Sequence, residues 1–174
     1  MLTLPVLEKP GKANSRRHLR SHSGALGMAV HHEKRTLPYT QKQVFDLVAD
    51  VERYPQFLPW CIGCRKTKTY DDGFDADLAI GFKMVREAFT SRVILTAREQ
   101  VDVVYKDGPF KHLTNRWGFA PTSDGRGCEI DFHLDFEFRS VVLQKLIGVL
   151  FEEAVRRMVS AFEDRAAQLY GKSN

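Results

Sequence analysis

Strict alternation of apolar and polar residues runs from Gly127 to Phe138. A period of two predicts a β-strand with one buried face and one solvated face. Ser140 begins a different pattern, in which apolar residues recur every three or four positions as far as Leu169. This spacing predicts an amphipathic helix of about 30 residues, capped by Ser140 and ended by Gly171. A helix about 45 Å long needs a broad apolar surface to cover.

The residues before this stretch predict such a surface. Residues 29–37 form a strand closed by Pro38, and Thr40 with Gln43 matches a capping box that begins a short helix. Pro55 and Pro59 limit a second helix to a few residues. Strands separated by short links are then predicted at 61–70, 74–84, 89–98, 101–106, 112–119 and 127–138. The chain is therefore expected to be α+β, with a curved antiparallel sheet of about seven strands, two short helices and one long C-terminal helix.

Length and composition fit one globular domain. The chain has 174 residues, 43% of them hydrophobic and 28% charged, with 12 Phe. Its net charge of +4 lies entirely in residues 1–27, which hold five basic residues and one acidic residue, Glu8. The remainder is neutral, with 21 basic and 21 acidic residues. Direct binding to DNA is therefore not expected of the folded body.

Residues 1–27 have no hydrophobic periodicity and are predicted to be a disordered basic tail before a domain at 28–172. Three explanations of the tail stay open: a true start at Met28, a functional basic arm, or an organelle transit peptide. The three cysteines favour a reducing compartment over a disulfide framework. Neither a secretory signal nor an apolar run long enough to span a membrane is apparent in the sequence.

The sequence offers little evidence for catalytic or metal chemistry. Cys61 and Cys64 form one isolated CxxC, which precedes a strand rather than opening a helix, and no metal site is predicted. His133 lies between Asp131 and Asp135 on the solvated face of its strand, where we expect a neighbouring cation such as Arg116 to balance the carboxylates. Nucleophile-elbow, phosphate-loop and dinucleotide motifs are not found.

Polar residues are rare on the face of the sheet expected to point inward. Ser91 and Asn115 are the only obvious ones, which is few for a catalytic site. We therefore predict that the protein is not an enzyme and has no catalytic residue. The apolar face of the sheet and that of the long helix either pack against one another as an ordinary core or enclose a cavity for an apolar ligand.

Several segments in order resemble a known family: residues 54–61, 89–93, 107–110, 117–119, 136–140 and 161–171. Over residues 28–171 the chain resembles the coenzyme Q-binding protein family of the START-like, polyketide cyclase/dehydrase superfamily. Bacterial relatives in that family are labelled ribosome-association toxins. The second cysteine of the CxxC and the N-terminal tail are not part of the family pattern. The resemblance implies a helix-grip fold, in which a curved sheet wraps around the long helix.

The resemblance also implies a function: a carrier or chaperone that holds a polyprenyl quinone, ubiquinone, and supports respiratory electron transport. Each buried methylene gains about 0.8 kcal/mol, so a polyprenyl tail needs a shielded path through water. No cofactor is required, and ubiquinone is the expected ligand. The predicted cavity walls are Leu78, Ile80, Phe82, Val93, Trp117, Phe119, Phe132, Leu134, Phe136, Leu143, Ile147, Leu150 and Phe151, and the predicted portal residues are Phe57, Leu58 and Trp60.

The expected partners are the quinone, a transient membrane surface and, in an alternative function, the large ribosomal subunit. In that alternative the protein would bind the large subunit and block subunit joining; a cyclase-like enzyme is a further alternative. The expected location is the cytoplasm, with peripheral contact at the inner membrane, or else the matrix side of the mitochondrial inner membrane.

Overall fold

The structure is a computed structural model that describes residues 29–82 and 85–171, without the side chain of Phe82. The predicted tail at 1–27 lies outside these residues. Ten elements follow in order: β1 (Ala29–Leu37), α1 (Gln41–Ala49), the 3₁₀ helix η1 (Val51–Gln56), β2 (Cys61–Tyr70), β3 (Gly73–Phe82), β4 (Val85–Thr96), β5 (Gln100–Asp107), β6 (Phe110–Pro121), β7 (Cys128–Phe138) and α2 (Val141–Tyr170). The predicted fold class is confirmed.

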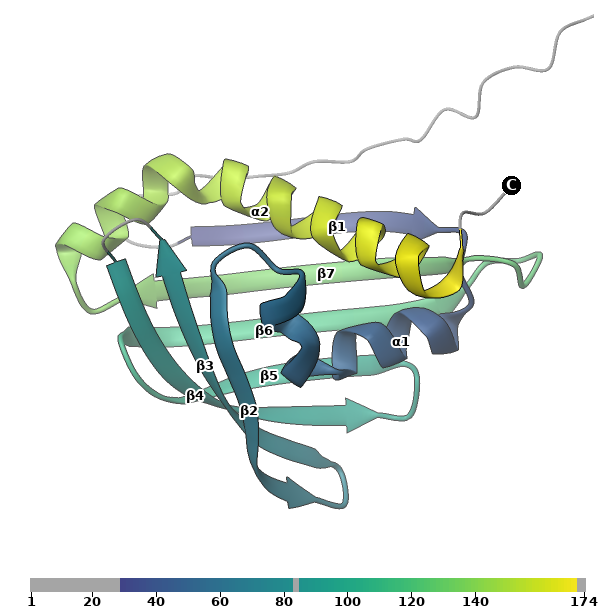
Figure 1. Cartoon of the computed structure of the whole chain (residues 1–174), viewed down its shortest axis with the longest axis horizontal. Coiled ribbons are helices and arrows are strands. Elements are labelled where there is room, and N and C mark those ends of the chain that lie inside the picture. The colour runs from purple at the N-terminus through teal and green to yellow at the C-terminus, as the bar shows by residue number, and fades with distance from the viewer. Residues whose placement is uncertain (1–28, 83–84, 172–174) are drawn as a thin grey trace, which may run out of the picture.

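The seven strands form one sheet in the order β1-β7-β6-β5-β4-β3-β2, and every neighbouring pair is antiparallel. The first strand therefore pairs with the last, while the other strands follow one another through short turns. In Figure 1, α2 runs alongside β1 and β7, and β2–β4 curve steeply away from the direction of the other strands. This curvature brings the far edge of the sheet round toward α2.

Local sequence signals explain how the elements begin and end. The Thr40 side chain accepts a hydrogen bond from the Gln43 backbone, and the Gln43 side chain accepts one from the Thr40 backbone. Ser140 caps α2 by accepting from the Leu143 amide. Gly73 makes the β2–β3 turn with φ +146°, and a Cβ there would lie 2.0 Å from the Val93 carbonyl oxygen. Only glycine fits that position.

Strand β4 begins at Val85, four residues before the predicted start at residue 89. The reason is that residues 85–88 continue the antiparallel register with β3, where Glu87 lies opposite Ile80. A charged residue on the inner face interrupted the apolar alternation from which the strand was predicted.

The hydrophobic core consists of two clusters. The larger cluster joins α1 and the C-terminal half of α2 to the middle of the sheet, and Phe162 and Ala166 are its buried residues on α2. The smaller cluster gathers Phe110, Phe136 and Phe138 at the other end of the sheet. The N-terminal half of α2 has no fully buried residue before Val155. That half therefore lies over space that the core does not fill.

Candidate functional site

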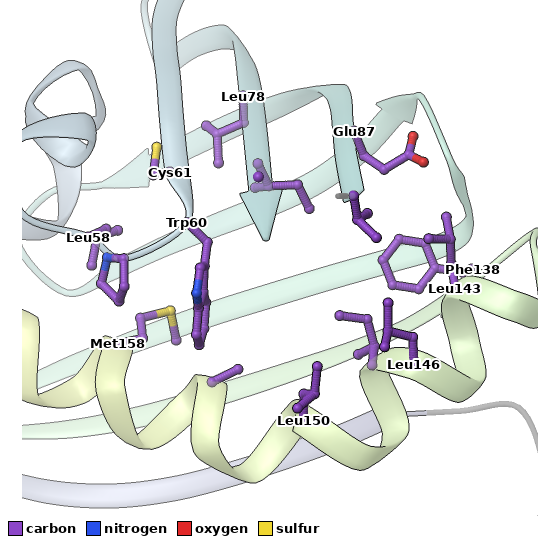
Figure 2. Close-up of a pocket in the computed structure, with 16 residues that line it drawn as sticks. Leu58, Trp60, Cys61, Leu78, Glu87, Phe138, Leu143, Leu146, Leu150 and Met158 are labelled. Carbon is purple, nitrogen blue, oxygen red and sulfur yellow. The ribbon is translucent and has the colours of Figure 1, made fainter. Parts of the chain in front are cut away.

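An apolar pocket of about 220 Å³ lies between the N-terminal half of α2 and strands β2–β4. Figure 2 shows Leu58, Trp60 and Met158 at one end and Glu87, Phe138 and Leu143 at the other, with Leu78 facing Leu150 across the space. The lining residues are Leu58, Pro59, Trp60, Cys61, Leu78, Ile80, Gly81, Val85, Glu87, Phe138, Leu143, Leu146, Ile147, Leu150, Ala154 and Met158.

The pocket is chemically simple. Glu87 is the one charged residue among those that line it, so the pocket favours hydrocarbon over ionic ligands. Its volume is smaller than the roughly 300–1,000 Å³ typical of drug-sized sites. A long apolar ligand would therefore place only part of its length there.

Trp60 occupies a strained position at one end of the pocket. Its φ is +70°, a left-handed conformation that is uncommon for a bulky residue. The Trp60 carbonyl accepts a hydrogen bond of 2.8 Å from the Gly81 amide, which holds this backbone against β3. Strained residues of this kind concentrate at functional sites, at a cost of about 1–3 kcal/mol. The indole points toward α2 (Figure 2).

Some of the predicted site residues meet at this pocket. The predicted walls Leu78 and Ile80 on β3 and Leu143, Ile147 and Leu150 on α2 line it. Two predicted portal residues, Leu58 and Trp60, line it as well. The structure thus brings together segments more than 60 residues apart in the sequence. Whether any of them contacts a ligand stays a prediction.

Four of the other eight predicted walls lie in the hydrophobic core instead. Val93, Phe119 and Phe132 are buried in the larger cluster, and Phe136 is buried in the smaller one. They face inward as predicted, but α1, α2 and η1 cover that part of the sheet. Val93, Phe119 and Phe136 are therefore closely packed rather than part of an open wall. Phe132 also lines a separate small cavity of about 40 Å³.

The remaining predicted residues are half-buried and pack against the clusters. Trp117 and Leu134 contact the larger cluster and Phe151 the smaller one. The ring of Phe57 packs at 5.3 Å from that of Phe162, and Phe57 does not line the pocket. The side chain of Phe82 lies outside the described residues.

Sequence reasoning missed several pocket residues. Ala154 and Met158 continue the helical spacing of Ile147 and Leu150, so the apolar stripe could have identified them. Phe138 belongs to the alternating strand in the same way. The further residues missed are Pro59, Cys61, Gly81, Val85, Glu87 and Leu146.

The two cysteines of the CxxC are free thiols. Burial raises the pKa of Cys61, and burial together with the neighbouring Cys61 raises the pKa of Cys64 to about 12. A thiol with a raised pKa is a poor nucleophile and a poor metal ligand at neutral pH. Within residues 29–82 and 85–171, His, Cys, Asp and Glu side chains form no group of three able to hold a metal ion.

The acidic side chains of β7 make polar contacts with side chains of the neighbouring strands. Asp131 contacts His32 at 2.6 Å on β1, and Asp135 contacts His112 at 2.9 Å on β6. Lys34 on β1 contacts Asp131 at 3.0 Å, so the prediction of a neighbouring cation is confirmed. Arg116 is not that cation, because it lies opposite His133 and pairs with Asp102 on β5. These contacts are typical of the solvated face of a sheet.

Exposed apolar side chains surround the start of α2, next to the pocket. Val142 and Val149 are 76% and 84% exposed, and Val141 and Leu146 are exposed as well. Leu146 also lines the pocket, so the exposed patch and the pocket are continuous. Contiguous apolar surface of this kind usually marks an interaction site. None of the helices in the described part of the chain could span a membrane.

Residues 37–163 match the family model described as polyketide cyclase / dehydrase and lipid transport. The "Ribosome association toxin RatA" of Rickettsia prowazekii is 41% identical over 137 residues, covering 76% of this chain and 92% of that protein. The "Coenzyme Q-binding protein COQ10 homolog B, mitochondrial" of Xenopus laevis is 35% identical over 179 residues, covering 97% of this chain and 71% of that protein. These relatives are not named as enzymes.

Solved structures agree on the fold. An 18 kDa protein from Caulobacter crescentus is 38% identical, with a TM-score of 0.68 over 82% of this chain and 99% of that one. The Zhui aromatase/cyclase of a Streptomyces species has a TM-score of 0.70 over 81% of this chain and 94% of that one, at 16% identity, and shares the fold alone. The START-like resemblance is thus confirmed, and the chain belongs to the polyketide cyclase/dehydrase and lipid-transport family.

Proposed function

We propose that the protein carries a polyprenyl quinone, ubiquinone, and supports respiratory electron transport without catalysing a reaction. The observation that carries this proposal is the apolar pocket beneath the N-terminal half of α2, with Glu87 as its one charged lining residue. An isoprenoid chain gains free energy by leaving water for such a pocket, at about 0.8 kcal/mol per buried methylene. The relative named as a coenzyme Q-binding protein supports the same ligand class.

A carrier of this kind needs to reach lipid. The exposed Val141, Val142 and Val149 adjoin the pocket, and Lys145 and Arg139 are exposed on or beside the same turns. Apolar side chains flanked by cations suit the headgroup region of an anionic bilayer. We therefore propose transient contact of this end of α2 with a membrane. The proposed location is the cytoplasm with peripheral contact at the inner membrane, or the corresponding mitochondrial matrix surface.

Lipid extraction tests the carrier function. The purified protein is incubated with vesicles that contain ubiquinone, separated from them, extracted with organic solvent and analysed by mass spectrometry. The expected result is quinone bound to the protein in an amount that saturates with the vesicle quinone content. Absence of quinone both in the protein as purified and after incubation would overturn the proposal.

A second function is binding to the large ribosomal subunit, which would block subunit joining. It is supported by the name of the Rickettsia relative at 41% identity. This function predicts that the protein co-sediments with large subunits, and that binding weakens with salt if the basic residues of 1–27 contribute. Co-sedimentation without quinone uptake would favour this function over the carrier.

A further inference from the structure

Three buried polar atoms lie on the inner face of the sheet without a hydrogen-bond partner among the described residues. They are the Ser91 hydroxyl on β4, the Tyr105 hydroxyl on β5 and the Asn115 amide oxygen on β6. Ser91 is 2% exposed, and Tyr105 and Asn115 are half-buried side chains whose polar atoms are inaccessible. Three neighbouring strands thus each contribute one unsatisfied polar group.

The strand register places these groups in one patch. Ser91 lies directly opposite Tyr105, at a spacing of about 5 Å between strands. Asn115 lies opposite Val103, the inward-facing residue of β5 two positions before Tyr105. A diagonal neighbour of that kind is about 7–8 Å away, which a tyrosine side chain can span. None of the three residues lines the pocket, so the side chains that cover these atoms must move apart before a single small group can contact all three.

The patch lies one step beyond the apolar pocket. On β4 the inward-facing residue before Ser91 is Phe89, which pairs with the pocket residue Leu78. Two residues along a strand correspond to about 7 Å. Asn115 is also in register with Val103 and Leu134, the two residues that pack against both hydrophobic clusters. The patch is thus at the junction of the clusters.

An unsatisfied buried polar group costs about 1–3 kcal/mol, so three together oppose folding unless something else binds them. Two hydroxyl groups and an amide can donate to carbonyl and ether oxygens, because the oxygen and nitrogen of an asparagine amide exchange places by a simple flip. Their chemistry fits a neutral ring that carries several oxygens. A charged headgroup would find no counter-ion among them.

We propose that Ser91, Tyr105 and Asn115 bind the oxygenated ring of the ligand, and that its apolar tail runs back through the pocket toward Leu143 and Leu146. This assignment rests on the proposed carrier function and adds the orientation of the ligand: ring inside, tail toward the exposed end of α2. It gives the buried polar atoms a partner that the described part of the protein does not supply.

Two probes with the same tail test the proposal. One is a benzoquinone with two methoxy groups, a methyl group and a decyl chain, and the other is decylbenzene, which lacks every oxygen. Transfer of each from vesicles to the protein is quantified by mass spectrometry for the wild type, Ser91→Ala, Tyr105→Phe and Asn115→Leu. Thr114→Val, an exposed neighbour on the same strand, is the matched control.

Each inner-face substitution is expected to weaken quinone binding by about 2- to 10-fold, as expected for one hydrogen bond, and to leave decylbenzene binding unchanged. The unfolding midpoint should stay the same or rise, because an unsatisfied group is removed. In infrared spectra, the carbonyl stretch of the bound quinone should lie below its frequency in alkane for the wild type and shift back toward it in Tyr105→Phe.

Equal losses for both probes, or undiminished quinone binding, would overturn the assignment. If the wild-type protein takes up decylbenzene but not the quinone, the assignment of the ring site is overturned. The protein would then carry apolar ligands without binding an oxygenated ring. Wild-type protein that takes up neither probe would overturn the proposed function and this assignment with it.

Discussion

Arg35 on β1 and Glu163 on α2 form an ion pair that attaches the C-terminal half of the long helix to the edge strand. The same half is held by the Tyr170 hydroxyl, which donates to the Gln43 carbonyl at 3.1 Å. Phe162 and Ala166 are buried there. The helix therefore has an anchored C-terminal half and an N-terminal half that, together with Met158, lines the pocket.

Removing this ion pair should affect stability and spare ligand binding. Glu163→Gln is expected to lower the free energy of unfolding by up to about 1 kcal/mol, because both side chains are partly exposed and solvent screens the pair. Quinone uptake should be unchanged, since neither Glu163 nor Arg35 lines the pocket. Urea denaturation and vesicle uptake measure the two effects, with the exposed Glu152→Gln as control. If quinone uptake fell by more than the fraction of unfolded protein accounts for, the ion pair would also matter for ligand binding. That result would contradict the separation of an anchoring role from a pocket role along the helix.

Two alanines twelve positions apart on α2 test the pocket directly. Ala154 lines the pocket, whereas Ala166 is 0% exposed in the core. Ala154→Phe should fill the pocket and abolish quinone uptake with little change in the unfolding midpoint. Ala166→Phe should lower stability by about 1–3 kcal/mol through overpacking. Similar behaviour of the two variants in thermal denaturation would show that the pocket is not an open space in solution.

Gly148 weakens the helix where it passes the pocket. Outside the helix's own backbone, a Cβ at Gly148 would meet no atom within 4 Å, so close packing does not require a glycine there. Gly148→Ala should therefore raise the free energy of unfolding by about 0.5–1 kcal/mol. Gly73→Ala, where a Cβ would lie 2.0 Å from the Val93 carbonyl oxygen, should instead destabilise the protein. Chemical denaturation of both variants gives the comparison.

If the stiffer helix opens less readily, Gly148→Ala should also slow quinone uptake from vesicles without changing the amount bound at equilibrium. A time course of uptake measures this. Uptake at the wild-type rate by a stabilised variant would show that bending at Gly148 does not limit ligand entry.

The exposed valines at the start of α2 should contribute to membrane contact. Val142→Gln with Val149→Gln removes exposed apolar surface and should reduce binding to anionic vesicles several-fold in a flotation assay. Stability should change by no more than about 0.5 kcal/mol per site, because neither side chain is buried. Val104→Gln, an exposed valine on β5, is the control and should leave vesicle binding unchanged. Equal vesicle binding by all three proteins would contradict membrane contact at this end of α2.

The stability of the protein should depend on pH through Asp75. Lys106 donates to this carboxylate at 2.8 Å and Tyr70 at 2.9 Å, and these bonds lower the pKa of Asp75 below its usual 3.8. A lowered folded-state pKa gives stability that is present above pH 3.8 and is lost as the pH falls through the folded value. Wild-type protein should therefore exceed Asp75→Asn in stability near neutral pH, and the difference should shrink below pH 3.8. Urea titrations over that range measure it, and a difference that did not change with pH would contradict this role.

The sequence by itself determined the elements and their faces. Alternation identified the strands, the Thr40–Gln43 capping box identified the start of α1, and the spacing from Ser140 to Gly171 matched α2 closely. These features follow from contacts between residues near in the chain, which the order of residues specifies directly. The pairing of the first strand with the last was not predicted from the sequence and is seen only in the structure.

Only the tertiary structure decided which inward-facing residues line open space. Val93 and Leu78 lie on neighbouring strands with the same alternation, yet one is buried in the core and the other lines the pocket. Along α2, Ala154 and Ala166 belong to one apolar stripe, yet Ala154 lines the pocket and Ala166 is buried in the core. The difference arises because α1, η1 and the C-terminal half of α2 fill one end of the curved sheet and leave the other unfilled. Periodicity specifies the direction in which a side chain points, but the curvature of the sheet and the position of the helices decide what it meets there.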